Sequence, residues 1–127
     1  KLHCFANDDV HRCRENDSLG GFNVMYPDKL DYQGVFECMK KGAFYASTGA
    51  RLRGIAVDGN KVYAGAENAR SVRLSTDGRY AELLTGDKPL TQAVFELNEY
   101  VKYFRITVED FNGKKAFSRA YFAEEFR

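Results

Sequence analysis

Hydrophobic and polar residues alternate along most of the chain from about residue 51 onward. The alternating runs are separated by residues that are typical of turns, at positions 58–60, 67–68, 77–78, 86–87, 98–99 and 112–113. An Asp-Gly or Asn-Gly pair between two such runs is a strong hairpin signal. The pattern therefore predicts a mainly β fold, with about seven strands in an antiparallel β-sandwich of immunoglobulin-like type.

Two apolar stripes in this region are the best candidates for its core. Side chains two residues apart in a strand point to the same face of the sheet. One stripe contains Phe104, Ile106 and Val108, and the other contains Val72 and Leu74. Because the chain has no Trp and no cysteine pair at the spacing of an antibody domain, the prediction concerns the architecture alone.

The first part of the chain has a mixed pattern. Alternation over residues 1–6 predicts a short strand, the polar residues 7–21 predict a loop, and residues 22–27 predict a second short strand. Residues 43–52 are expected to be extended, with a turn at Gly49. We therefore divide the chain into a mixed α/β region, residues 1–50, and a β domain, residues 51–127.

One helix is predicted between these strands. Asp31 is a suitable N-cap, and Gly42 follows two lysines at the point where a helix would end. Between them Val35, Phe36 and Met39 share one face.

Composition and charge argue against two classes of partner. The chain has 127 residues, about the size of one domain, and a formal net charge of +1, so no basic surface for nucleic acid is indicated. No apolar run approaches the roughly 20 residues that span a bilayer. Cys4, Cys13 and Cys38 match no zinc-ribbon or Cys-x-x-Cys spacing. We interpret them as reduced thiols in a reducing compartment, which predicts a cytoplasmic protein.

The polar segment NDDVH, residues 7–11, is the main candidate for chemistry. Asp9 and His11 are two residues apart, so on an extended chain their side chains can approach the same divalent ion. The alternative is a polar turn in which Asn7, Asp8 and Asp9 cap the backbone. Two ligands do not hold a catalytic metal, which usually takes three or more from the protein.

Weaker candidates lie elsewhere. Ser47 and Thr48 have no histidine base nearby in the sequence, so a nucleophilic role has little support. Several aromatic residues can form either a ligand platform or part of the core: Tyr100, Tyr103, Phe117 and Tyr121.

The order of these features along the chain resembles that of a known protein family. ANDDVHR is followed by GGF, by a helix that runs into MKKGAFYASTG, and by IAVDGNKVYAG. This order resembles the C-terminal end of metal-dependent phosphoesterases of the PHP (polymerase and histidinol phosphatase) superfamily, in the subgroup that carries a small β-sandwich after the catalytic barrel. The resemblance covers nearly the whole chain and is most specific over residues 6–12 and 36–59.

The resemblance implies a function for the parent protein. Asp9-Val10-His11 is similar to the last Asp-x-His ligand motif of a PHP barrel, which makes Asp9 and His11 metal ligands for zinc, manganese or iron. Residues 1–50 would then be the remnant of the barrel, and residues 51–127 its β-sandwich accessory domain. The paired histidines that open a PHP domain have no counterpart here, so we assign no catalytic residue. We expect this chain alone to be inactive, and we expect the divalent metal ions in the full-length parent.

Two further expectations concern partners. The chain begins with Lys1, and its apolar pattern is already present at Leu2, so we expect it to be part of a longer polypeptide whose N-terminal barrel is missing. Val35, Phe36 and Met39 would then either fold back onto the sandwich or drive self-association. The competing interpretation is a non-catalytic β-sandwich that serves as a binding or interaction module.

Overall fold

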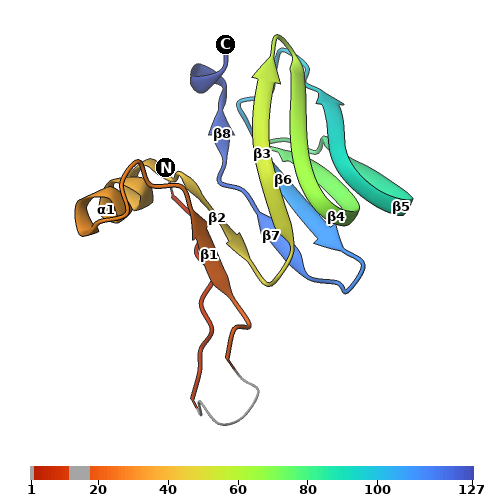
Figure 1. Cartoon of the computed structure of the whole chain (residues 1–127). Helices are drawn as coiled ribbons and strands as arrows, with labels where there is room; N and C mark the ends of the chain where they lie inside the picture. The colour runs from red at the N-terminus through yellow and green to blue at the C-terminus, as the bar shows by residue number, and fades with distance from the viewer. Residues whose placement is uncertain (1, 12–17) are drawn as a thin grey trace.

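The computed structural model describes residues 2–11 and 18–127, and its fold is mainly β (Figure 1). The mainly β prediction is therefore confirmed. The elements, in chain order, are β1 (Phe22–Met25), α1 (Tyr32–Lys41), β2 (Phe44–Ser47), β3 (Arg51–Asp58), β4 (Lys61–Thr76), β5 (Ala81–Glu96), β6 (Tyr103–Asp110), β7 (Lys115–Phe117), β8 (Tyr121–Phe122) and the 3-10 turn η1 (Ala123–Glu125).

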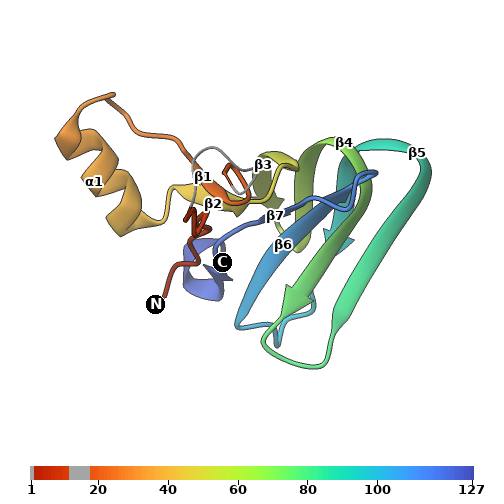
Figure 2. The ribbon, with the colours of Figure 1, turned by 90° about the horizontal axis from the view of Figure 1, so that it is seen from below.

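All eight described strands belong to one antiparallel sheet. Its main order is β1-β2-β7-β6-β4-β3, with β5 beside β4 and β8 beside β6. One edge of β4 pairs with β5 along most of its length. The other edge pairs first with β3 and then, beyond Glu67, with β6. The sheet curls because β4 changes partners along its length (Figures 1 and 2).

The predicted turns at residues 67–68 and 86–87 are wrong. Both positions lie inside long strands, β4 and β5, where the strand is irregular. Asn68 has a φ of 51°, and the register of β4 shifts between Gly65 and Ala69. In β5 the register passes directly from Leu90 to Thr85, so the residues between them bulge out of the ladder. Asn and Gly suit bulges as well as turns, because both tolerate unusual backbone angles. The four strands predicted between residues 61 and 97 are therefore two long strands, β4 and β5.

The last predicted strand, residues 114–122, is divided into two strands in the structure. Lys115–Phe117 and Tyr121–Phe122 are separate short strands, β7 and β8, and both pair with β6. Between them the Ser118 hydroxyl accepts a hydrogen bond from the Ile106 amide, at 2.9 Å. A side chain therefore replaces a backbone acceptor in the ladder at this point.

The core is one cluster of buried residues that connects most strands of the curled sheet. The predicted core residues Phe104, Ile106, Val108, Val72 and Leu74 are all fully buried, which confirms both apolar stripes. They form one cluster with apolar residues from β2, β3, the first half of β4 and the end of β5, among them Tyr45, Leu52, Val62, Ala64 and Phe95.

The first part of the chain joins the same sheet. β1 pairs with β2 over its whole length, and β2 pairs with β7 through Ala46↔Phe117 and Ser47↔Ala116. Strands from both sides of residue 50 are thus hydrogen-bonded to each other. The division at residue 50 into a barrel remnant and an accessory domain stays a prediction about the parent protein.

Residues 2–6 do not form the predicted strand. The Asn23 side chain holds this segment instead: its Oδ1 accepts from the Ala6 amide at 3.0 Å, and its Nδ2 donates to the Ala6 carbonyl at 2.8 Å. The Asn23 side chain thus satisfies both the N–H and the C=O of Ala6, so Ala6 has hydrogen-bond partners without a neighbouring strand.

Helix α1 begins and ends as predicted. The Asp31 carboxylate accepts from the Gly34 amide at 2.7 Å, and Gly42 has a φ of 69° and closes the helix with its own amide. The helix projects from the sheet (Figures 1 and 2). Phe36 and Met39 on its apolar face are 45% and 37% exposed, so this face does not fold back onto the sheet. Self-association through it stays a prediction.

Candidate functional site

The segment that contains Asp9 and His11 is an irregular stretch ahead of β1. The Asp8 carboxylate accepts hydrogen bonds from two backbone amides across the loop, Leu19 at 2.7 Å and Gly21 at 2.8 Å. These contacts join Asp8 to residues 11 and 13 positions later in the chain, so they are not the local Asx cap of the polar-turn interpretation. Asp8 therefore has a structural task.

Asp9 and His11 lie together beside this loop. Asp9 has a φ of 53°, in the left-handed region that Asp and Asn enter more readily than most residues. The His11 Nδ1 lies 2.7 Å from the Asp9 carbonyl oxygen. Because a carbonyl oxygen only accepts, Nδ1 carries the proton in this contact. A neutral form of the ring with this contact has its lone pair at Nε2. This is the tautomer in which a histidine binds a metal through Nε2.

The other histidine faces a different part of the molecule. His3 Nε2 lies 3.3 Å from the Lys40 carbonyl at the end of α1, and its ring meets the edge of Phe44 at 6.0 Å. Among the described residues, no group of three or more His, Cys, Asp or Glu side chains is close enough to hold a metal ion. The role of Asp9 and His11 as an oxygen and a nitrogen ligand for zinc, manganese or iron therefore stays a prediction.

The hydrogen bonds to Asp8 have a consequence for pH dependence. The amides of Gly21 and Leu19 lower the pKa of the Asp8 carboxyl below its ordinary value of 3.8. A lowered pKa means that the charged carboxylate stabilises the loop above pH 3.8, and that this contribution is lost as the pH falls through the lower, folded-state value. We expect the Leu19 and Gly21 amides to shift and to exchange faster in that range, in an NMR titration.

A matched substitution controls this prediction. Asp8→Asn keeps one acceptor oxygen but removes the titrating group, so its Leu19 and Gly21 amides should not respond to pH in this range. A response of the same size in the variant would assign the titration to another carboxyl group.

Ser47 and Thr48 serve the turn between β2 and β3. The Ser47 hydroxyl is fully buried, donates to the Ala50 carbonyl at 2.7 Å and accepts from the Gly49 amide at 2.9 Å. The Thr48 hydroxyl accepts from the Lys115 amide at 2.9 Å and ties the turn to β7. Both side chains thus have structural partners.

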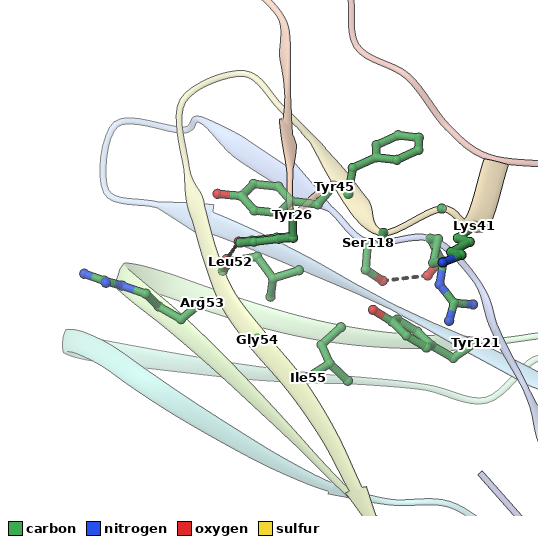
Figure 3. A pocket seen from close by; sticks show the side chains of 13 residues that line it. Tyr26, Lys41, Tyr45, Leu52, Arg53, Gly54, Ile55, Ser118 and Tyr121 are labelled. Carbon is green, nitrogen blue, oxygen red and sulfur yellow. Dashed lines mark hydrogen bonds between the residues drawn. The ribbon is translucent and has the colours of Figure 1, made fainter. Parts of the chain in front are cut away.

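A groove of about 480 Å³ lies between β3, the start of β2 and the segment that joins β7 to β8 (Figure 3). We call it the β3 groove. Tyr26 and Tyr45 stand at one end of it, and Ile55 and Tyr121 lie opposite each other further along. The Tyr26 hydroxyl donates to the Leu52 carbonyl at 3.3 Å. The walls are mostly apolar and aromatic, as in many binding sites.

The phenol groups of Tyr26 and Tyr121 in the β3 groove are neutral at ordinary pH. Burial is the main cause that raises the pKa of Tyr26, and the neighbouring Tyr45 raises it further. Burial also raises the pKa of Tyr121, and the charge of Arg119 opposes this rise only in part. Both hydroxyls can therefore donate hydrogen bonds over the normal range of pH.

The four aromatic residues considered as a platform divide into two groups. Tyr121 stacks on Phe104 at 5.3 Å, and Tyr103 packs on Phe122 at 5.5 Å. Phe117 is half-buried, whereas Tyr100 is 80% exposed. Three of the four are thus packed, and Tyr121 alone lines the β3 groove.

The β3 groove could not be found from sequence patterns. Its walls come from residues far apart in the chain, and the local signal was weak. Gly54 interrupts an alternating run, which indicates a bulge, and the register of β3 does shift between Leu52 and Gly54. Nothing in the sequence pairs this bulge with Tyr121.

Comparison with known proteins gives no family. A scan against protein-family models, a search of curated proteins and a search of solved structures found no significant match. Within the described residues, no helix is long and apolar enough to cross a membrane.

Proposed function

We propose that this chain is the C-terminal part of a PHP-type metal-dependent phosphoesterase, in which Asp9 and His11 are two ligands of a divalent metal. The observation that carries the proposal is the contact between the His11 Nδ1 and the Asp9 carbonyl, at 2.7 Å. It holds the imidazole in the tautomer with its lone pair on Nε2, and hydrogen bonds of this kind orient metal-binding histidines in many proteins.

Each residue has a defined part in this proposal. His11 supplies a nitrogen ligand oriented by the backbone, and Asp9 supplies a carboxylate. Asp8 holds the loop closed through Leu19 and Gly21. A bound divalent ion would lower the pKa of a water molecule and bind phosphate oxygens. The remaining ligands would come from the catalytic barrel of the parent, so this chain alone should not hydrolyse phosphate esters.

The curled sheet would be the accessory domain of such an enzyme. The change of partners along β4 brings the two halves of the long β4–β5 hairpin against one core cluster. This arrangement supports the finer proposal that residues 51–127 form an immunoglobulin-like β-sandwich.

The ligand pair can be tested in the 127-residue chain with Mn²⁺, which broadens the NMR signals of nuclei near it. We expect the His11 ring protons and the Asp9 amide to broaden first, at millimolar Mn²⁺, because two ligands bind weakly. His11→Ala and Asp9→Asn should abolish the effect, and His3→Ala should leave it unchanged. Broadening that centres on His3, or none near His11, would overturn the assignment of these ligands.

The enzymatic part has its own test. The chain should not cleave p-nitrophenyl phosphate with added Mn²⁺. Cleavage that is lost in His11→Ala would show that the chain carries a complete site, against our expectation.

A binding module is the second candidate function, and the β3 groove is the observation that favours it. The two functions are compatible if the sheet is the accessory domain of the enzyme.

A further inference from the structure

One edge of β3 has no strand beside it in the part of the chain that the structure describes. β3 ends the order of the sheet, and its other edge pairs with β4. The β3 groove and a second cavity of about 310 Å³ lie along this edge, and they share Ile55, Arg119 and Tyr121. A concave surface therefore follows the unpaired edge.

The register determines which backbone groups of β3 face this surface. Gly59 and Asn60 form a two-residue turn, and Asp58↔Lys61 is the pair that closes it. Such a closing pair exchanges its backbone hydrogen bonds, and the pairs then alternate along the hairpin. It follows that Ile55 and Val57 direct their N–H and C=O groups away from β4, toward the groove.

Leu52 shows that a backbone carbonyl on this edge of β3 can accept a hydrogen bond from outside the sheet. It lies on the other side of the bulge in β3, and its carbonyl accepts the Tyr26 hydroxyl at 3.3 Å. A carbonyl on this edge thus already takes a hydrogen-bond donor that belongs to no strand. Tyr26 also marks where an added strand would have to end.

The groove has an apolar floor for the side chains of such a strand. Ile55 and Val57 are half-buried and pack against the core, and Tyr121 and Phe126 form the facing wall. Side chains at every second position of an added strand would lie on this floor. An alternating apolar sequence therefore fits the groove.

The main part of the groove carries positive side chains, and Glu125 lines the second cavity. Lys41, Arg53 and Arg119 line the main part, which has no acidic residue in its lining. Arg53 is paired with Glu67 at 2.7 Å and Arg119 with Glu125 at 2.6 Å. Lys41 has no ion-pair partner among the described residues. The excess of positive charge favours an acidic segment over a basic one.

We propose that the β3 groove binds an extended acidic segment of a partner protein, which adds to the free edge of β3 as an antiparallel strand. All strand pairs described in this sheet are antiparallel. Backbone hydrogen bonds to Ile55 and Val57 give this mode its affinity, and the apolar floor gives its preference for alternating sequences. The proposal does not depend on the phosphoesterase function.

A synthetic peptide provides the probe. We choose acetyl-Glu-Val-Thr-Val-Thr-Val-Glu-amide, whose valines would face the floor and whose glutamates match the positive rim. In an antiparallel pair, the residues whose side chains face the floor also direct their N–H groups at Ile55 and Val57. N-methylation of the valines should therefore abolish binding, and N-methylation of the threonines should leave it intact.

Amide hydrogen exchange of the 127-residue chain locates the binding. Without peptide, the Ile55 and Val57 amides should exchange fast, whereas those of Ala56 and Asp58 are protected by β4. With peptide, Ile55 and Val57 should slow by about tenfold or more at saturation. Each backbone hydrogen bond that N-methylation removes should weaken binding by up to about tenfold. A lysine-flanked version of the peptide should bind more weakly than the glutamate-flanked one.

Several outcomes would overturn the proposal. They are equal binding of the valine-methylated peptide, protection that appears on β1 or β5 instead of β3, and equal or tighter binding of the lysine-flanked peptide. Protection of Ile55 and Val57 that rises with protein concentration in the absence of peptide would show that a second copy occupies the edge.

A variant of the chain tests the same edge. Val57→Pro removes one backbone donor from the free edge of β3 without removing a hydrogen bond to β4, so the chain should remain folded and should bind the peptide more weakly.

Discussion

Phe104→Ala is expected to reduce the free energy of unfolding by about 3–5 kcal/mol, the typical loss for a large aromatic side chain removed from a core. Phe104 is fully buried in β6, and its ring contacts those of Tyr121 at 5.3 Å and Phe126 at 5.4 Å. Its removal would leave a cavity where the C-terminal segment packs against the sheet. Urea unfolding monitored by circular dichroism measures the loss.

Phe111→Ala is the matched control. Phe111 lies in the turn after β6 and is 43% exposed, so its substitution should change stability by only about 0.5 kcal/mol. Equal losses for the two variants would mean that Phe104 is not part of the core.

Ser118→Ala is expected to cost about 1–3 kcal/mol, the price of leaving a buried polar group without its partner. Ser118 is 4% exposed, and its hydroxyl accepts from the Ile106 amide at 2.9 Å and donates to the Arg119 carbonyl at 2.7 Å. Without the hydroxyl, the Ile106 amide has no acceptor at this gap between β7 and β8. Both the stability and the exchange of the Ile106 amide should respond.

The exchange measurement separates this effect from a general loss of stability. In Ser118→Ala the Ile106 amide should exchange faster by a larger factor than its neighbours in β6. Ser18→Ala, at an exposed position, should change neither quantity. If the Ile106 amide stays as protected as in the parent chain, another group must accept its hydrogen bond.

The sequence was most informative where one local pattern has one structural meaning. The N-cap at Asp31 and the stop at Gly42 both depend on neighbouring residues alone, and both are present. Alternation likewise identified Phe104 and Leu74 as core residues. Such features follow from short-range chemistry, so no knowledge of the rest of the fold was needed.

Patterns with two structural meanings gave the errors. Asn68 and Gly86 have the chemistry of turns, but a long strand uses the same chemistry to bulge. The pairing partners decide between the two, and these are set by β3, β5 and β6 together. The contact between His11 and the Asp9 carbonyl was also beyond the sequence, because spacing shows that two residues are close but not how a ring is turned.

The pairing of β2 with β7 has a consequence for the order of folding. The β4–β5 hairpin forms from residues that are neighbours in the chain, whereas Ala46 must find Phe117 across most of the molecule. Closing such a long loop costs entropy that nearby contacts do not repay, so non-local pairs slow folding. We therefore expect the long β4–β5 hairpin to form first, and β1, α1 and β2 to join the sheet last.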